Sequence, residues 1–314
     1  SILSLYLSAF HFFVVTLQSK FCTKKMETYT ETDKLRSYSM AFSRSVFSNL
    51  LLYNDFSRLD AIIRMHDTPN DRVVTYWDYI RYMYRAIKKN YRCEYVYKNE
   101  FLTRLLIKKY GTKHTIAINE FKVSRSIADI ALFNGESKAF EIKTEYDTQK
   151  RLKSQIGNYE QLFDKCYVII PENALSQYLK VVPNNIGIII LRPEKNSIIL
   201  EEWREALYNN YINVDILMRS LRTQEYKNIV LNYYGKLPKV SCFHMFDECA
   251  SLLKEIPTKL LKNLFIQEIK HRSSITSSLN KIPYELRQIG LCMNLDMNSI
   301  TTLRENLDRP ILKV

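Results

Sequence analysis

The hydrophobic pattern of this chain changes period twice, and these changes restrict the fold more than any other feature of the sequence. Up to Gly111 the apolar residues recur at intervals of three and four, as Phe42, Val46 and Phe47 do, which is typical of amphipathic helices. Between residues 115 and 145 short runs rich in Ile, Val and Phe replace that spacing. The sequence therefore predicts helices, then a group of strands, then helices again.

The middle of the chain is expected to form an α/β unit. Asn134-Gly135 is a strong signal for the hairpin that joins the second strand to the third. Strands joined by short turns and followed by a helix, a strand, a helix and a strand indicate a mixed sheet flanked by helices. The predicted strands are 115–123, 126–134, 138–145, 167–170 and 186–191, and the predicted helices between them are 148–163 and 174–181.

Helical regions are expected on both sides of this unit, and no further strand is predicted from Trp203 onward. Residues 2–17 are almost wholly apolar, but they are too few for a membrane span, which needs about 20. We interpret them as an extension before a natural start at Met26, with a membrane-associated interaction protein as the alternative. The predicted parts are an apolar extension at 1–25, a helical N-terminal region at 26–89, the α/β core at 90–202 and a helical C-terminal domain at 203–314.

The charge of the chain favours an anionic partner. The 46 Lys and Arg residues exceed the 33 Asp and Glu residues, a formal net charge of +13, and nucleic acid is the commonest partner of so basic a protein. Basic residues alternate with tyrosines between residues 81 and 113, where Lys88, Lys89 and Arg92 are candidates for phosphate contacts. The alternatives are that the lysines coat a solvated surface and that many of the tyrosines belong to the core.

The six cysteines show no paired spacing, as expected of reduced thiols in a cytoplasmic protein. Cys242, His244 and Cys249 offer three zinc ligands, but no fourth is evident.

Two acids and a lysine are expected to meet on one face of the hairpin. Residues alternate faces along a strand, so Glu141 and Lys143 point the same way, and a three-residue loop around Gly135 would place Asp129 opposite Glu141. Two adjacent carboxylates repel each other unless a cation lies between them. Mg²⁺ prefers such oxygen ligands, and the carbonyl of Ile142 is a further candidate. A metal-bound water would then attack a phosphodiester, with Lys143 orienting the water or offsetting the charge on the phosphate.

The helix after the hairpin adds polar groups that suit a nucleic-acid substrate. Gln155 and Tyr159 are four residues apart and share one helix face, where they would position the substrate backbone or the lysine. Arg151, Lys153 and Arg125 are candidates for binding phosphates.

These motifs resemble the PD-(D/E)XK nuclease superfamily, and within it the RecB-like branch that carries a Q-x-x-x-Y motif. The matching residues are Asp129 for the acid of the first motif strand, Glu141-Ile142-Lys143 for E-x-K, Gln155 and Tyr159 for the helix motif, and Glu100 for the acid on the preceding helix.

The resemblance covers roughly residues 90–191 and leaves the helical flanks unexplained. It implies a restriction-endonuclease-like, four-stranded mixed sheet, chemistry with one or two Mg²⁺ or Mn²⁺ ions, and DNA as the usual substrate. It also implies that Glu100 joins Asp129 and Glu141 in holding the metal. Ala128 stands where the name-giving pattern has Pro, a residue that many members lack.

We therefore expect a cytoplasmic Mg²⁺- or Mn²⁺-dependent deoxyribonuclease, for example an endonuclease of phage defence or repair, with membrane association unlikely. A protein partner or a second copy would bind through the helical flanks. The alternatives are a catalytically silent module that binds nucleic acid or a partner, and a merely structural ion pair. Weaker candidates are Glu120 and Glu145 as metal ligands, Asp147 as a helix cap, and a helix-turn-helix at 284–307.

Overall fold

The computed structural model describes residues 29–67, 73–195 and 197–311, so the predictions for the apolar extension lie outside the described residues. The chain forms two compact units, residues 1–34 and residues 35–314. Within the described part of the chain, no helix is both long and apolar enough to cross a membrane.

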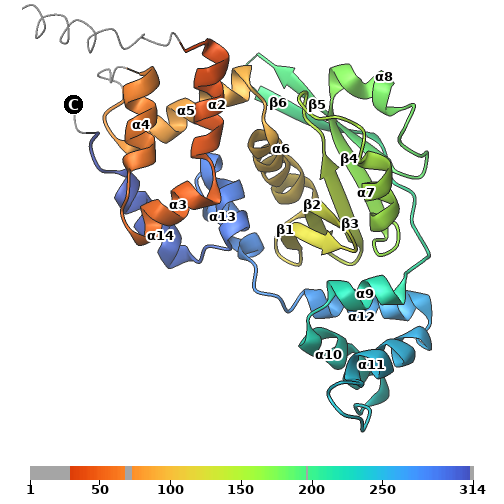
Figure 1. Ribbon diagram of the computed structural model, residues 1–314. Helices are drawn as coiled ribbons and strands as arrows, with labels where there is room; N and C mark the ends of the chain where they lie inside the picture. The colour runs from red at the N-terminus through yellow and green to blue at the C-terminus, as the bar shows by residue number, and fades with distance from the viewer. Residues whose placement is uncertain (1–28, 68–72, 196, 312–314) are drawn as a thin grey trace, which may run out of the picture. The chain divides into compact units, whose positions relative to one another are not determined.

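The second unit is built on a six-stranded sheet in the order β1-β2-β3-β4-β5-β6 (Figure 1). The outer pairs β1–β2, β2–β3 and β5–β6 are antiparallel, whereas β3, β4 and β5 run parallel. This confirms the prediction of a mixed sheet flanked by helices. The strands are β1 (Ile116–Val123), β2 (Ser126–Phe133), β3 (Ser137–Ile142), β4 (Lys165–Pro171), β5 (Gly187–Glu194) and β6 (Ser197–Arg204).

The hairpin between β2 and β3 has the loop that the sequence predicts. Phe133 pairs with Ser137, which leaves three residues in the loop. Gly135 has a φ of 104°, a left-handed conformation that glycine adopts without steric cost. The hairpin register is therefore fixed by the loop.

Strand β6 was not predicted. Its second half, from Glu201 to Arg204, is charged or exposed because β6 lies at the edge of the sheet. Some of these charges pair with neighbouring strands: Arg192 contacts Glu201 at 3.1 Å, and the Tyr167 hydroxyl donates to Glu202. A strand with one open edge needs no continuous apolar run, so its hydrophobic signal was weak.

Helices from both ends of the chain cover one face of the sheet. The predicted helical stretch at 74–110 is interrupted at residues 91–93, and its last part is a π-helix that ends before Gly111. Half of the tyrosines in this stretch are buried, as Tyr84 and Tyr97 are. The helices are α2 (Glu31–Ala41), α3 (Arg44–Leu52), α4 (Ser57–His66), α5 (Tyr76–Asn90), α6 (Glu94–Phe101), η1 (Leu102–Tyr110), η3 (Ile275–Lys281), η4 (Tyr284–Leu286), α13 (Arg287–Met293) and α14 (Met297–Leu307).

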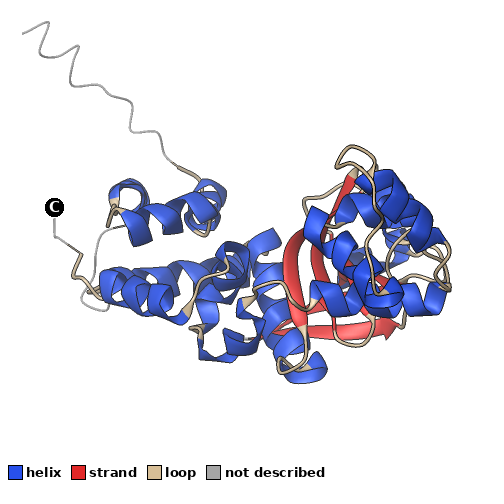
Figure 2. Cartoon of the chain, turned by 90° about the horizontal axis from the view of Figure 1, so that it is seen from below, coloured by secondary structure: helices blue, strands red, loops and turns tan. Residues whose placement is uncertain are grey.

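Other helices cover the opposite face, so the sheet lies between helical layers (Figure 2). Helix α7 is shorter than predicted at both ends, because residues 148–151 and 160–163 form turns. The helices of this face and its loops are α7 (Leu152–Tyr159), η2 (Glu172–Ala174), α8 (Leu175–Tyr178), α9 (Val214–Ser220), α10 (Thr223–Tyr234), α11 (Met245–Lys254) and α12 (Thr258–Ile269).

Alternation along the buried strands divides the core into two layers. Ile189 and Leu191 of β5 belong to the cluster beneath α3–α6, while Ile188 and Ile190 belong to the cluster beneath α7 and α9–α12. The chain returns to the first layer after α12, and Ile311 donates a backbone hydrogen bond to Val74. The region predicted as one C-terminal domain therefore contributes to both layers.

Candidate metal and nucleic-acid site

Asp129 on β2 and Glu141 on β3 lie opposite each other. The ladder ends at the pair Ile130–Phe140, and the two acids follow one step further along. Asp129 Oδ2 accepts the backbone N–H of Ile142 at 2.7 Å. The hairpin register thus brings the two predicted acids to one end of the strands.

Glu141 is almost fully buried and is held by three side chains. Lys143 Nζ lies 2.7 Å from Glu141 Oε1, and Gln155 Nε2 donates to the same oxygen. The Tyr159 hydroxyl lies 2.6 Å from Glu141 Oε2. Gln155 Oε1 in turn accepts from Lys143 Nζ at 3.1 Å. The structure therefore brings the predicted E-x-K and Q-x-x-x-Y residues into one hydrogen-bonded cluster.

Tyr159 supports this cluster from the core. Its side chain is buried, and burial followed by the charge of Glu141 raises its pKa well above the ordinary value. The hydroxyl therefore stays protonated and donates, with Glu141 Oε2 and the carbonyl of Ile127, 2.7 Å away, as its acceptors.

Lys98 is a member of the site that sequence reasoning missed. Its Nζ lies 3.2 Å from Asp129 Oδ1 and 2.5 Å from Glu94 Oε1, and only 5% of its side chain is exposed. Burial alone would lower the pKa of Lys98, but the two carboxylates hold it above its ordinary value. The available signal was the i,i+4 spacing of Glu94 and Lys98 on the helix before the strands.

Burial raises the pKa of Asp129 to about 6. Lys98 and the N–H of Ile142 oppose this shift, and the carboxylates of Glu141 and Glu94 add to it. A cation placed between Asp129 and Glu141 would stabilise the ionised form of both carboxylates.

The acids open into a cavity of about 410 Å³. Two of the arginines predicted to bind phosphate, Arg125 and Arg151, line it, whereas Lys153 is exposed on α7 outside it. Ser126 and Ser154 add hydroxyl groups to the wall. A phosphate placed in this cavity would lie among two arginines, Lys98 and Lys143.

Glu100 is not part of this cavity, which corrects its predicted role as a metal ligand. Six residues advance about 600° around a helix, so Glu100 lies about 120° from the face of Glu94. It is fully buried, 3.2 Å from Lys88 and 2.7 Å from Arg104, and the Tyr284 hydroxyl also contacts it. Glu94, rather than Glu100, is the acid of α6 that lines the cavity.

Three of the predicted phosphate-binding residues also lie elsewhere. Lys88 and Lys89 line a separate cavity of about 520 Å³ between α5, the β5–β6 hairpin and η4. Arg92 forms an ion pair with Glu145 at 3.0 Å, so these two side chains are each other's partners. The basic stretch before the strands therefore does not form one surface with the acids.

The structure also shows where the weaker candidate residues lie. Glu120, with a φ of 57°, is exposed at the rim of the cavity. Asp147 accepts the N–H and hydroxyl of Thr144 at 2.8 Å and so caps the turn after β3, not helix α7. Of the two cysteines that could have served as zinc ligands, Cys242 is exposed and Cys249 is buried.

The donor set suits a hard cation that keeps much of its own hydration. Among residues 29–67, 73–195 and 197–311, no three His, Cys, Asp or Glu side chains gather as a metal site. Asp129 and Glu141, with the carbonyl of Ile142 as the third predicted ligand, fit Mg²⁺, which is usually bound through one or two carboxylates, waters and substrate phosphates.

Comparison with known proteins identifies similar sequences. The family described as bacteriophage P4 protein cII matches residues 87–286. Protein cII of Enterobacteria phage P4 is 26% identical over 180 residues, which cover 56% of this chain and 67% of that protein. The solved structure of the SPO1766 protein of unknown function from Silicibacter pomeroyi aligns with a TM-score of 0.26 at 12% identity, over 41% of this chain and 86% of that one. The family match includes every residue that lines the cavity of Asp129.

Proposed function

The chain belongs to the bacteriophage P4 protein cII family, and we propose that it is a Mg²⁺- or Mn²⁺-dependent nuclease that hydrolyses phosphodiester bonds in DNA. The observation that carries this proposal is the cluster of Asp129, Glu141, Lys143 and Gln155 at one cavity, with Tyr159 bound to Glu141 from the core. The resemblance of these five residues to the PD-(D/E)XK nucleases supports it, and so does the basic character of the chain.

In this mechanism Asp129, Glu141 and the Ile142 carbonyl would hold the metal. A bound Mg²⁺ lowers the pKa of its water and offsets charge on the phosphate. Lys143, fixed between Glu141 and Gln155, orients the attacking water and donates toward the phosphate oxygen that gains charge. Arg125 supports the substrate from the cavity wall.

Lys98 has a second role in this account. In the absence of metal its ammonium group neutralises Asp129. A cation held by Asp129 would leave the ammonium group of Lys98 available to a substrate phosphate, with Glu94 as its remaining partner. Asp129 would then have a cationic partner with or without the metal, which matters because an unpaired buried charge is costly.

The second candidate function is a nucleic-acid-binding module without catalysis. It is favoured by the same contacts, since Lys98 and Lys143 satisfy both carboxylates without a metal. Such a module would bind DNA without metal-dependent turnover.

Cleavage of labelled single- and double-stranded DNA distinguishes these candidates. The unchanged protein is expected to cut DNA with Mg²⁺ or Mn²⁺ and to stop in EDTA, and Asp129→Ala protein is expected to lose at least about a hundredfold in rate. Equal cleavage by both proteins would refute the assignment, and DNA binding without any cleavage would favour the silent module.

The pH dependence of metal binding follows from Asp129. Because its folded pKa is about 6, above the ordinary value, the proton competes with the metal below that pH. At limiting Mg²⁺ the cleavage rate is expected to fall about tenfold per pH unit below 6. A rate profile at two Mg²⁺ concentrations checks this prediction, since saturating metal should move the inflection to lower pH. An inflection that does not respond to metal would contradict it.

The raised pKa of Asp129 also affects the stability of the metal-free protein. Between the ordinary aspartate pKa and pH 6, the folded protein keeps this proton while the unfolded chain loses it. The free energy of unfolding therefore falls as pH rises through this range.

A further inference from the structure

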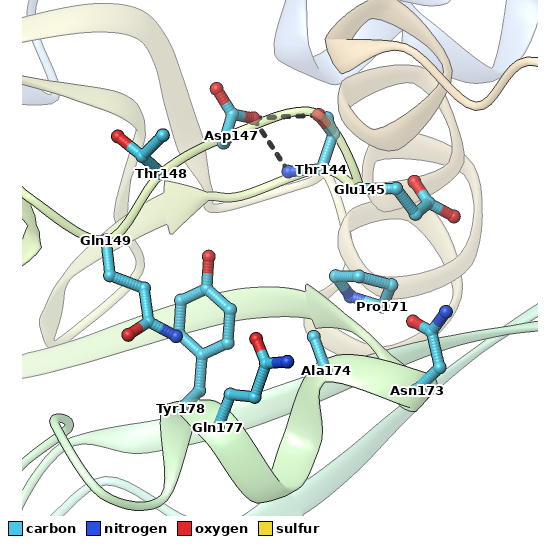
Figure 3. A pocket seen from close by; sticks show the side chains of 10 residues that line it. All are labelled: Thr144, Glu145, Asp147, Thr148, Gln149, Pro171, Asn173, Ala174, Gln177 and Tyr178. Atoms are coloured by element: carbon cyan, nitrogen blue, oxygen red, sulfur yellow. Dashed lines mark hydrogen bonds between the residues drawn. The ribbon is translucent and has the colours of Figure 1, made fainter.

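A second polar pocket, of about 400 Å³, adjoins the candidate catalytic cavity. It lies at the ends of the parallel strands β3 and β4, between the loop 144–149 and the segment 171–178 (Figure 3). Asp147 lines both spaces. Ligands of sheets with parallel strands commonly bind beyond the carboxyl ends of those strands, so the position suits a part of the substrate next to the reacting phosphate.

The pocket is lined by carboxamides whose hydrogen-bonding capacity is unused. Gln149, Asn173 and Gln177 make no side-chain hydrogen bond within the described part of the chain, and in Figure 3 the amides of Asn173 and Gln177 point from the 171–178 segment toward the opposite loop. Each carboxamide both donates and accepts hydrogen bonds. Such groups match the edge of a heterocycle that carries donors and acceptors side by side.

Tyr178 adds a hydroxyl aimed into the same space. Only 3% of the residue is exposed, its hydroxyl points toward the loop of Asp147 and Gln149, and it has no hydrogen-bond partner among the described residues. Burial, followed by the charges of Asp147 and Glu141, raises the pKa of Tyr178, so the hydroxyl stays a donor. A hydroxyl at the wall of a pocket that has no protein partner is available to donate to a ligand.

The charges of the pocket distinguish a base from a phosphate. Asp147 lines the pocket together with Glu145, which is paired with Arg92, and no basic side chain among the described residues lines it. A phosphate would instead be drawn to Arg125 and Arg151 in the neighbouring cavity. Tyr146, between the two acids in the sequence, is 57% exposed and stacks on Tyr91 at 4.7 Å between ring centroids. Exposed aromatic faces of this kind stack on unpaired bases.

We propose that this pocket receives an unpaired nucleobase of the substrate strand, one position from the phosphate at Asp129 and Glu141. The inference rests on the proposed nuclease function and specifies its substrate as a single strand or a strand with an unpaired base. Gln149, Asn173 and Gln177 read the base edge, and Tyr178 donates to it.

Fluorescence anisotropy in EDTA, where no cleavage occurs, tests this proposal with labelled DNA. The unchanged protein is expected to bind a single-stranded oligonucleotide more tightly than the same sequence as a duplex. The double variant Asn173→Ala/Gln177→Ala should lose about tenfold in single-strand affinity and leave duplex affinity unchanged, and Tyr178→Phe should lose about threefold. Ser176→Ala, on the same helix but outside the pocket, serves as the matched control and should bind like the unchanged protein.

Oligonucleotides with a single abasic position complete the test. Removal of the bound base should weaken binding by the unchanged protein and have a smaller effect on the double variant, in which Gln149 and Tyr178 remain. Three results would overturn the base pocket: equal affinities of the double variant and the unchanged protein, an abasic effect as large in the variant as in the unchanged protein, or a preference for duplex. The cleavage assay separates the two proposals. If the unchanged protein cleaves DNA but the pocket variants bind DNA normally, the nuclease function is supported and the base pocket is refuted. If the pocket variants show the expected losses of affinity but no protein cleaves DNA, the base pocket is supported and the nuclease function is refuted.

Discussion

Lys143→Met protein is expected to cleave saturating DNA at least about a hundredfold more slowly than the unchanged protein. Methionine retains the length and the packing of the lysine but removes the ammonium group that lies 2.7 Å from Glu141 Oε1 and 3.1 Å from Gln155 Oε1. Glu141 keeps its contacts with Gln155 and Tyr159, so the acid stays in position. The loss should therefore fall on the chemical step.

Single-turnover cleavage at saturating protein and Mg²⁺ measures this effect, with Lys122→Met as the control for removal of an exposed charge. The control should retain the rate of the unchanged protein. Thermal unfolding followed by circular dichroism establishes that both variants are folded. A Lys143→Met rate within about threefold of the control would show that the lysine does not take part in the reaction.

Lys262→Met is expected to lower the free energy of unfolding by about 3–5 kcal/mol. Lys262 Nζ lies 2.9 Å from Asp164 Oδ1, and both side chains are almost fully buried. Asp164 Oδ2 also accepts the backbone N–H and the hydroxyl of Ser137, at 2.7 and 2.9 Å. The pair therefore joins α12 to the starts of β3 and β4, and the substitution leaves a buried carboxylate without its cation.

Urea denaturation measures this loss against Lys165→Met, which removes the neighbouring lysine. Lys165 is more exposed and pairs with Glu136 and Glu205 at the surface, so its removal should cost less than about 1 kcal/mol. An equal loss of unfolding free energy in the two variants would contradict a special contribution of the buried pair to stability.

The local parts of the site were predictable because short-range geometry determines them. Asn134-Gly135 fixed a three-residue loop, which sets the register that brings Asp129 opposite Glu141. The i,i+4 spacing of Gln155 and Tyr159 then placed both side chains near Glu141. Each of these relations involves neighbours in the chain or across one hairpin.

The relations that failed depend on how helices rotate and where distant segments return. Glu100 was assigned to the site by resemblance, but the burial of α6 turns it toward Lys88 and Tyr284, a residue far along the chain. Lys98 was missed because a lysine on an amphipathic helix is ordinarily solvated. The return of α13 and α14 to the first core layer left no local signal in the sequence.

Anomalous diffraction from crystals soaked in Mn²⁺ tests the metal site most directly. We expect one peak between the carboxylates of Asp129 and Glu141, within coordination distance of the Ile142 carbonyl, with Lys98 Nζ displaced from Asp129 Oδ1. Glu141→Gln crystals treated in the same way should lose the peak. A map without density at this position, in which Lys98 still contacts Asp129 as it does without metal, would contradict the metal-dependent mechanism.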